Sequence, residues 1–152
     1  MDAALIAVVG TLLGVIATHW FQGRAAERTA SLARTEQLRQ ERIATYSAFA
    51  GAVVDYRQSQ NDRWFKAHLE PGSEEAEQSR HASYRQRTAA RQALFRVQLM
   101  CDDAETRRRA ETAFETTHCM HEAADDAERT RRSDEAKEAL ARFIEAAGPG
   151  LR

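Results

Sequence analysis

The stretch Glu115–Glu122, with the sequence ETTHCMHE, holds the residue types that most often do chemistry. In a helix, Glu115 and His118 lie one turn apart on the same face, and so do His118 and His121. Carboxylate, imidazole and thiolate groups are the ligands that zinc and related transition metals bind. One hypothesis is therefore a metal or thiol site built from Glu115, His118, Cys119 and His121.

A second interpretation places these histidines at the border of a helix packing face. Di-iron bundles need a Glu-x-x-His motif on two helices and further glutamates on two others, whereas this chain carries one copy. Cys101 has no CxxC partner that would mark a redox thiol. The chain also lacks a phosphate-binding loop, a nucleotide fingerprint and a Ser-His-Asp arrangement. We therefore expect no catalytic centre and no cofactor.

An apolar run at the N-terminus predicts a membrane anchor. Residues 3–18 read AALIAVVGTLLGVIAT and contain no charge, and His-Trp-Phe follows. About 20 apolar residues are needed to cross a bilayer, and aromatic residues favour its interface. The residues that define the predicted span are Ala3, Leu5, Gly10, Gly14, Ile16, Trp20 and Phe21.

The flanks of this run predict its orientation. Every Lys and Arg follows the run and none precedes it, and basic flanks stay on the cytoplasmic side. We expect a single-pass protein of the cell membrane, with the N-terminus outside and the C-terminus in the cytoplasm. Arg24 and Arg28 would meet lipid headgroups. Gly10 and Gly14 form a GxxxG pair that would allow a homodimer through the span.

Composition indicates an all-α chain of one domain beyond the anchor. The 152 residues include only two Pro and seven Gly, and Ala, Arg, Glu and Gln are strong helix formers. The net charge is −1, so no overall field attracts nucleic acid. The basic runs 107–109 and 129–132 are bracketed by acidic residues, which favours a solvated face over a nucleic-acid site.

Helix start and stop signals divide the rest of the chain. Pro71 and Gly72 end a helical pattern that covers residues 23–68. Ser73 predicts the next helix start, and Gly148 with the Pro and Gly after it ends the last helix. Two further starts are predicted at Asp102, with Glu105 three residues on, and at Ser133.

Helical spacing of apolar residues predicts the faces that pack in the core. In residues 43–65 the expected face is Ile43, Tyr46, Phe49, Ala50, Val53, Val54, Tyr56, Trp64 and Phe65. In the helix that follows Ser73 and runs to about Leu99, it is Tyr84, Thr88, Arg91, Leu94, Phe95, Val97 and Met100. In the two later helices it is Ala110, Ala113, Phe114, Thr117, His118, His121 and Ala124, then Leu140, Phe143, Ile144 and Ala147.

Short loops between long amphipathic helices predict an antiparallel up-and-down bundle. We expect three parts: a transmembrane anchor at residues 1–22, a basic helical stalk at 23–42 and a cytosolic bundle at 43–152. Leu32 and Leu38 are too sparse to define a coiled-coil seam in the stalk.

Three segments resemble the kilB-like proteins of actinomycetes. These are the anchor with its Gln-Gly-Arg flank, the R-x-E-R-(aliphatic)-x-x-Tyr pattern at Arg39–Tyr46, and the FRVQL segment at Phe95–Leu99. The family takes its name from a membrane-associated plasmid transfer protein of streptomycetes. The resemblance implies a helical membrane protein linked to conjugative elements. It carries over no catalytic residues.

Three functional hypotheses follow. The leading one is a membrane-anchored helical protein that acts by contact with an unidentified protein partner, in plasmid transfer or another envelope complex. The second is a metal- or thiol-dependent bundle enzyme that uses the Glu115–His121 cluster. The third is an envelope-spanning coiled protein with its C-terminus outside, against which the arginine distribution argues.

Overall fold

The computed structural model describes the backbone of residues 2–151 and the side chains of residue 27 and residues 29–151. Every regular element in this described part is helical, which confirms the all-α prediction. The elements are α1 (Asp2–Leu69), α2 (Glu74–Met100), α3 (Ala104–His118), the 3₁₀ turn η1 (Cys119–Glu122), α4 (Asp126–Ala147) and the 3₁₀ turn η2 (Pro149–Leu151).

The chain divides into two compact units, residues 1–40 and residues 41–152. The backbone of α1 is helical over 68 residues without a break at Gly23. In the first unit, Leu32 and Leu38 are exposed.

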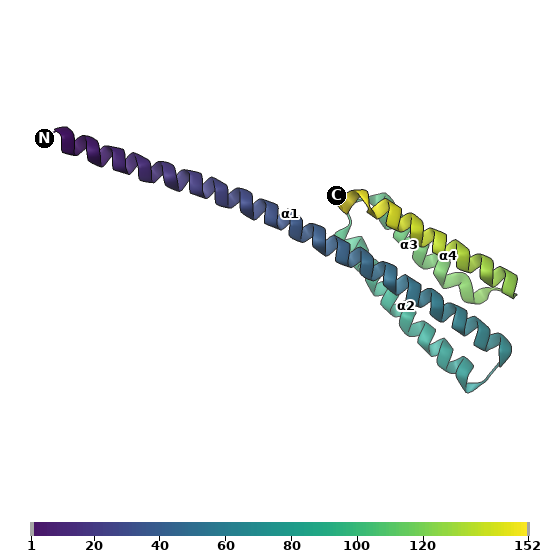
Figure 1. Ribbon diagram of the computed structural model, residues 1–152. Coiled ribbons are helices and arrows are strands. Elements are labelled where there is room, and N and C mark those ends of the chain that lie inside the picture. Colours follow the sequence, from purple (N-terminus) through teal and green to yellow (C-terminus); the bar gives the residue numbers. More distant parts are fainter. Residues whose placement is uncertain (1, 152) are drawn as a thin grey trace. The chain divides into compact units, whose positions relative to one another are not determined.

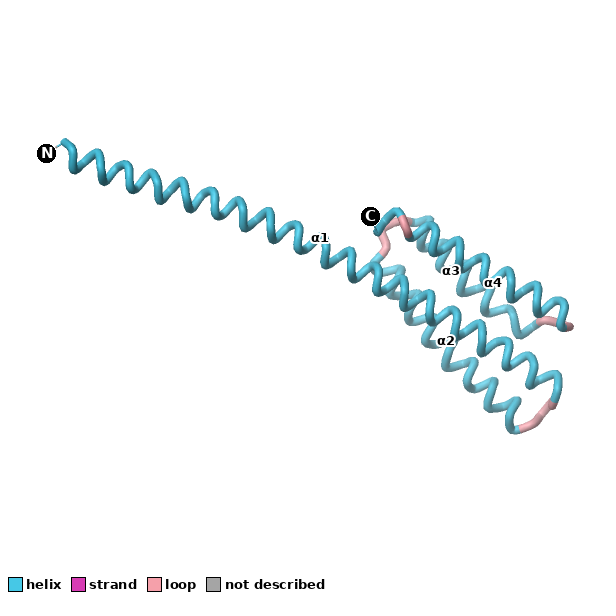
Figure 2. The backbone as a smooth tube through the Cα atoms, in the orientation of Figure 1, coloured by secondary structure: helices cyan, strands magenta, loops and turns pink. Residues whose placement is uncertain are grey.

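The second unit is a helical bundle (Figure 1). It consists of the C-terminal part of α1 and all of α2, α3 and α4, joined by the short loops drawn in Figure 2. Successive helices run in opposite directions. Arg42, at the start of this unit, pairs with Asp102 after α2, and Gln60, near the end of α1, bonds to the C-terminal end of α3. Each loop therefore lies at one of the two ends of the bundle.

All four helices supply the hydrophobic core. The rings of Tyr46 and Phe49 meet Phe143 edge-on, at centroid distances of 5.8 and 5.0 Å. Tyr56 stacks on Phe114 at 5.8 Å. Small residues fill the spaces between these rings: Ala90, Ala93, Ala110, Ala113, Ala139 and Ala147. An alanine interior lets the helix backbones approach closely, so few large side chains are needed to fill the core.

The predicted boundary between α1 and α2 is confirmed. Gly72 adopts φ +78°, a left-handed conformation that glycine takes without a steric penalty. The Ser73 hydroxyl then accepts a hydrogen bond from the backbone N–H of Ala76 at 3.1 Å. Acidic residues in the first turn of α2 stabilise the helix, because their negative charges lie at the positive end of the helix dipole.

The other two predicted helix starts are wrong in position. The N-cap of α3 is Asp103, whose carboxylate accepts from the N–H and the hydroxyl of Thr106 at 2.7 Å each. Asp102 instead pairs with Arg42. The N-cap of α4 is Asp125, and Ser133 is buried inside that helix. Helix α4 thus begins two turns earlier than its apolar residues suggest, because an Asp cap and surface ion pairs also stabilise a polar first segment.

The predicted core face of α2 is wrong by part of a turn. Leu94 and Val97 are buried as expected, but Tyr84 and Phe95 are 45% and 51% exposed. The helix buries Ser83, Ala90 and Ala93 instead. Large apolar residues dominated the sequence pattern, whereas the close-packed interface favours small ones. For the same reason Ile43, Val54, Phe65 and Ile144 are exposed rather than buried. Ala124 is exposed as well, because it lies in the loop before α4 and not on a helix.

Within the part of the chain whose side chains the structure describes, no helix is long and apolar enough to cross a membrane. The predicted span, with Gly10, Gly14 and Trp20, and the headgroup residues Arg24 and Arg28 lie outside the side chains that the structure describes. The anchor and its orientation therefore stay predictions.

Candidate functional site

A polar cluster occupies the core at the end of the bundle where α1 and α3 finish. Its centre is Gln60, whose side chain is 1% exposed. The Gln60 amide nitrogen lies 2.8 Å from the carbonyl oxygen of His118 and 3.3 Å from that of Thr117. Its amide oxygen accepts a hydrogen bond from the Ser83 hydroxyl at 2.7 Å. One side chain thus joins α1, α2 and α3.

Two imidazoles border this cluster. His118 Nδ1 lies 2.9 Å from the Tyr56 hydroxyl. His121 Nδ1 lies 2.9 Å from the His118 carbonyl oxygen and 3.1 Å from the Gln60 amide nitrogen. We assign a neutral His118 that accepts from Tyr56, and a His121 that donates its Nδ1–H to the carbonyl, because this pattern gives each group a complementary partner. Among the described residues, no buried side-chain polar atom lacks a partner.

Burial controls the protonation of this cluster. Removal from water lowers the pKa of His118 and of His121, and the nearby guanidinium groups of Arg87 and Arg63, respectively, lower it further. Glu115 and Glu122 act in the opposite direction on His118 with smaller effect. Burial also raises the pKa of Tyr56 to about 12. At neutral pH the cluster is therefore an uncharged hydrogen-bonded network, which is suited to holding helices in register.

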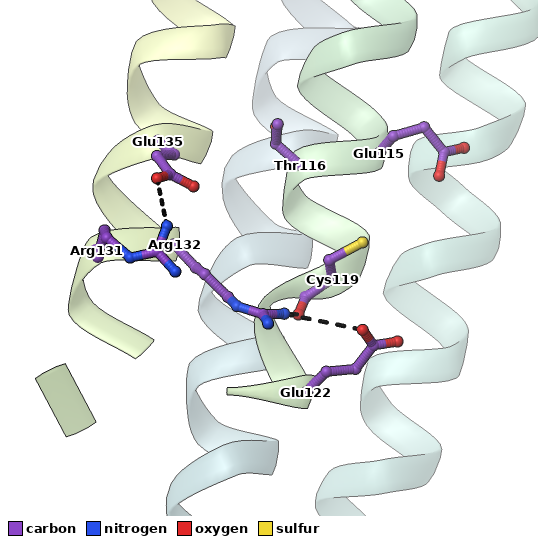
Figure 3. Close-up of a pocket in the computed structure, with 7 residues that line it drawn as sticks. All are labelled: Glu115, Thr116, Cys119, Glu122, Arg131, Arg132 and Glu135. Atoms are coloured by element: carbon purple, nitrogen blue, oxygen red, sulfur yellow. Dashed lines mark hydrogen bonds and ion pairs between the residues drawn. The ribbon is translucent and has the colours of Figure 1, made fainter. Parts of the chain in front are cut away.

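The structure does not gather the four residues of the proposed metal site. His118 and His121 are half-buried and their Nδ1 atoms have hydrogen-bond partners. Cys119 is exposed, and it lines a groove between α3 and α4 together with Glu115 (Figure 3). Within the described part of the chain, no group of three His, Cys, Asp or Glu side chains is placed to hold a metal ion.

The groove at Cys119 has a volume of about 510 Å³, and most of the residues that line it are charged. In Figure 3, Arg131 pairs with Glu135 at 2.7 Å and Arg132 with Glu122 at 3.8 Å. Arg132 also donates to the backbone carbonyl of Cys119. The charges that line the groove therefore compensate one another. The other cysteine, Cys101, is buried and has no CxxC partner.

The outer face of α2 carries large apolar side chains that remain exposed in the bundle, although the Arg63 guanidinium of α1 lies over the Tyr84 ring at 5.5 Å. Tyr84, Phe95 and Leu99 recur at helical spacing and are 45%, 51% and 85% exposed. They lie opposite the buried stripe that contains Ala90 and Val97. We call this surface, together with the arginines beside it, the α2 outer face. The arginines are Arg80, Arg85, Arg87, Arg91 and Arg96.

The sequence reasoning missed two groups of functional interest. Gln60 and Ser83 were not identified, although Gln60 continues the buried spacing of Val53, Tyr56 and Trp64 and could have been found by it. The apolar character of Tyr84 and Phe95 also predicts that they are buried, whereas both are exposed.

Fold and site together define a small antiparallel helical bundle with a hydrogen-bonded polar cluster inside and an exposed apolar and basic face on α2 outside. A family model described as KilB plasmid transfer protein matches residues 43–151, which form nearly all of the bundle. The chain belongs to this family, as its resemblance implied. No curated protein and no solved structure matches the chain.

Proposed function

We propose that this chain is a membrane-anchored helical protein that serves plasmid transfer by contact with another protein, without a catalytic centre of its own. The membership in the KilB plasmid transfer family carries the proposal. The bundle supports it in a second way. Its histidines take part in an internal network, while the outer face of α2 exposes three large apolar side chains, those of Tyr84, Phe95 and Leu99.

The proposal includes the predicted anchor. Residues 1–22 would form a single span that holds residues 43–152 at the cytoplasmic side, and Gly10 with Gly14 would allow two spans to pair. Such an arrangement would concentrate the bundle at the membrane, where a transferring plasmid must cross.

The test of the transfer role is a mating assay. A host that carries the transfer element is compared with one in which the coding sequence of this chain is deleted, and with the deletion complemented by the full chain or by a chain without residues 1–22. We expect the deletion to lower the frequency of transfer and only the full chain to restore it. Unchanged transfer in the deletion strain would refute the proposed function.

The test of the anchor is fractionation with a carbonate wash. The full chain should stay in the membrane fraction and the chain without residues 1–22 should not. A reporter that is active only in the cytoplasm should be active when it is fused after Arg152, and a reporter that is active only after export should be inactive there. Activity of an exported reporter at that position would instead favour the envelope-spanning hypothesis.

A further inference from the structure

The arginines of α2 flank its exposed apolar stripe on both sides. On the helical wheel, Arg80, Arg87 and Arg91 lie along one edge of the stripe, and Arg85 and Arg96 lie along the other. From Arg80 to Met100 the helix contains no acidic residue. The α2 outer face is thus a narrow apolar strip between two positive rows.

Most of this positive charge is not neutralised within the bundle. Arg80 pairs with Glu77 at 2.5 Å, and Arg91 lies 3.9 Å from Glu115. In the described part of the chain, no ion pair joins Arg85, Arg87 or Arg96 to a carboxylate. A surface with such an excess of one charge is complementary to a partner of the opposite charge.

The width of the positive strip indicates the size of the partner. Glu111 accepts a hydrogen bond from Gln98, and Glu115 lies beside Arg91, so the carboxylates of α3 bound one arginine row. On the other side, Glu41 and Asp62 of α1 line the grooves that contain Arg96 and Arg85. The strip is therefore one helix wide. A broad anionic surface, such as a lipid bilayer or a nucleic acid, would also meet these carboxylates and be repelled by them.

The strip also offers a place for an apolar anchor. Leu99 lines a groove of about 410 Å³ with Ala44, Thr45 and Met100, and Arg96 and Glu41 lie at its rim. An amphipathic helix that lays its apolar side chains into such a groove is a common mode of peptide recognition.

We propose that the α2 outer face binds an acidic amphipathic helix of the partner protein. The apolar seam of that helix would pack on Tyr84, Phe95 and Leu99, and its flanking Asp and Glu residues would pair with the two arginine rows. This inference rests on the proposed function, in that it names the chemistry of the protein partner, but its test does not depend on plasmid transfer.

The test uses the full chain and two synthetic helical peptides of about three heptads, with leucine at the seam positions. One peptide carries Glu at the flanking positions and the other carries Lys. We expect the full chain to bind the Glu peptide at least about tenfold more tightly than the Lys peptide, by a margin that shrinks with added salt. Equal binding, or preference for the Lys peptide, would overturn the proposal.

Variants locate the binding on this face. Phe95→Ala with Leu99→Ser should lower the affinity for the Glu peptide about tenfold or more, because buried apolar side chains contribute most of the binding energy in such contacts. Arg85→Glu with Arg96→Glu should also lower the affinity for the Glu peptide and remove most of the salt dependence of its binding. The matched control is Ile144→Ser on α4, which replaces a side chain of similar exposure (54%) and should leave binding unchanged. Circular dichroism of each variant establishes that its helical content is retained, and an equal loss in the control would overturn the assignment.

Two further arms separate other occupants. The first arm compares binding of the full chain to phosphatidylglycerol vesicles and to phosphatidylcholine vesicles. If Arg85→Glu with Arg96→Glu lowers the preference for phosphatidylglycerol and leaves binding of the Glu peptide unchanged, the face binds lipid and the proposal is wrong. If the full chain associates with itself in a concentration-dependent way that Leu99→Ser abolishes, the occupant is a second copy. If the deletion strain transfers the plasmid at an unchanged frequency while the full chain still binds the Glu peptide, the proposed function is refuted and this inference is retained.

Discussion

Gln60 shows how one residue can hold three helices together. An amide nitrogen carries two hydrogens, and three acceptor oxygens lie within 3.3 Å of that of Gln60: the Tyr56 hydroxyl and the carbonyls of Thr117 and His118. Burial of an amide destabilises the fold unless its hydrogen bonds are made, because a buried amide without partners loses its hydrogen bonds to water and gains none in return. The position is therefore sensitive to a change of residue type in a way that its surface neighbours are not.

We expect Gln60→Leu to lower the free energy of unfolding by about 2–3 kcal/mol. The substitution leaves the Ser83 hydroxyl without its partner and removes one of the two donors to the carbonyl oxygen of His118. Urea unfolding followed by circular dichroism measures the effect, with Gln58→Leu as the control, since Gln58 is exposed on the same helix. A Gln60→Leu protein as stable as the control would show that the network contributes nothing to the fold.

The two imidazoles predict a pH dependence of stability. The pKa of His118 and of His121 lies below the ordinary value of 6.5 in the folded chain, so the unfolded chain binds more protons as the pH falls. Stability from these groups is complete above pH 6.5 and is lost as the pH falls through the lowered folded pKa. Protonation would also make Nδ1 of His118 a donor toward Tyr56.

The urea midpoint should therefore decrease between about pH 8 and pH 5, a window that lies above the titration of ordinary carboxyl groups. His118→Asn with His121→Asn should flatten this profile, while His81→Asn, at an exposed position, should not. A profile that rises toward acid pH, or one that the double substitution leaves unchanged, contradicts the assignment of neutral, buried imidazoles.

The two cysteines should differ in reactivity. Cys119 is exposed, whereas Cys101 is 5% exposed and directs its sulfur toward the Asp103 carbonyl at 3.4 Å. Titration of the native chain with a thiol reagent should show one fast and one slow thiol, and both should become fast in denaturant. Cys119→Ser should remove the fast reaction. Two fast thiols in the native chain would mean that the start of α3 opens readily.

Among the elements, α3 illustrates what a sequence can and cannot locate. A helix start with an acidic cap was predictable from the Asp-Asp-x-Glu pattern, but two adjacent aspartates fit it, and only the backbone decides between them. At Asp103 the extended conformation directs the carboxylate at the N–H of Thr106. At Asp102 the side chain is 96% exposed and forms a surface pair.

This difference gives a prediction at the scale of the helix. Asp103→Ala should destabilise the chain by about 1 kcal/mol through loss of the cap of α3. Asp102→Ala should change stability by less than about 0.5 kcal/mol, because exposed ion pairs contribute little. Urea unfolding of the two variants side by side measures the contrast. Equal effects would mean that the two carboxylates share the capping role.

The face of each helix was harder to predict than the helix itself. Tyr56, Phe114 and Phe143 were assigned to the core correctly, because each lies within a broad apolar stripe. On α2 the stripe of large residues and the stripe of buried residues differ, since the core takes alanine and serine there. The large apolar residues of α2 that the sequence pattern places in the core therefore lie on its exposed face. This is the face that we propose to bind a partner.

At the scale of the whole molecule, the family match begins at residue 43 and the compact bundle begins at residue 41. The hydrophobic core is formed within this unit, by residues from Tyr46 to Ala147. Every aromatic contact described above also joins residues of the bundle. A unit that contains its own core should fold without the rest of the chain.

We therefore expect a fragment of residues 41–152 to be helical and to unfold cooperatively in urea, as small domains do. A fragment of residues 51–152 is the matched comparison, because it lacks Tyr46 and Phe49 and leaves the buried ring of Phe143 without its edge-on partners. Loss of large buried aromatic side chains costs about 3–5 kcal/mol each, which is comparable to the whole stability of a typical domain of about 5–15 kcal/mol. The shorter fragment should consequently be largely unfolded in buffer. If both fragments unfold with the same midpoint, the first turns of the bundle do not belong to its cooperative core, and if neither unfolds cooperatively, the bundle depends on residues 1–40.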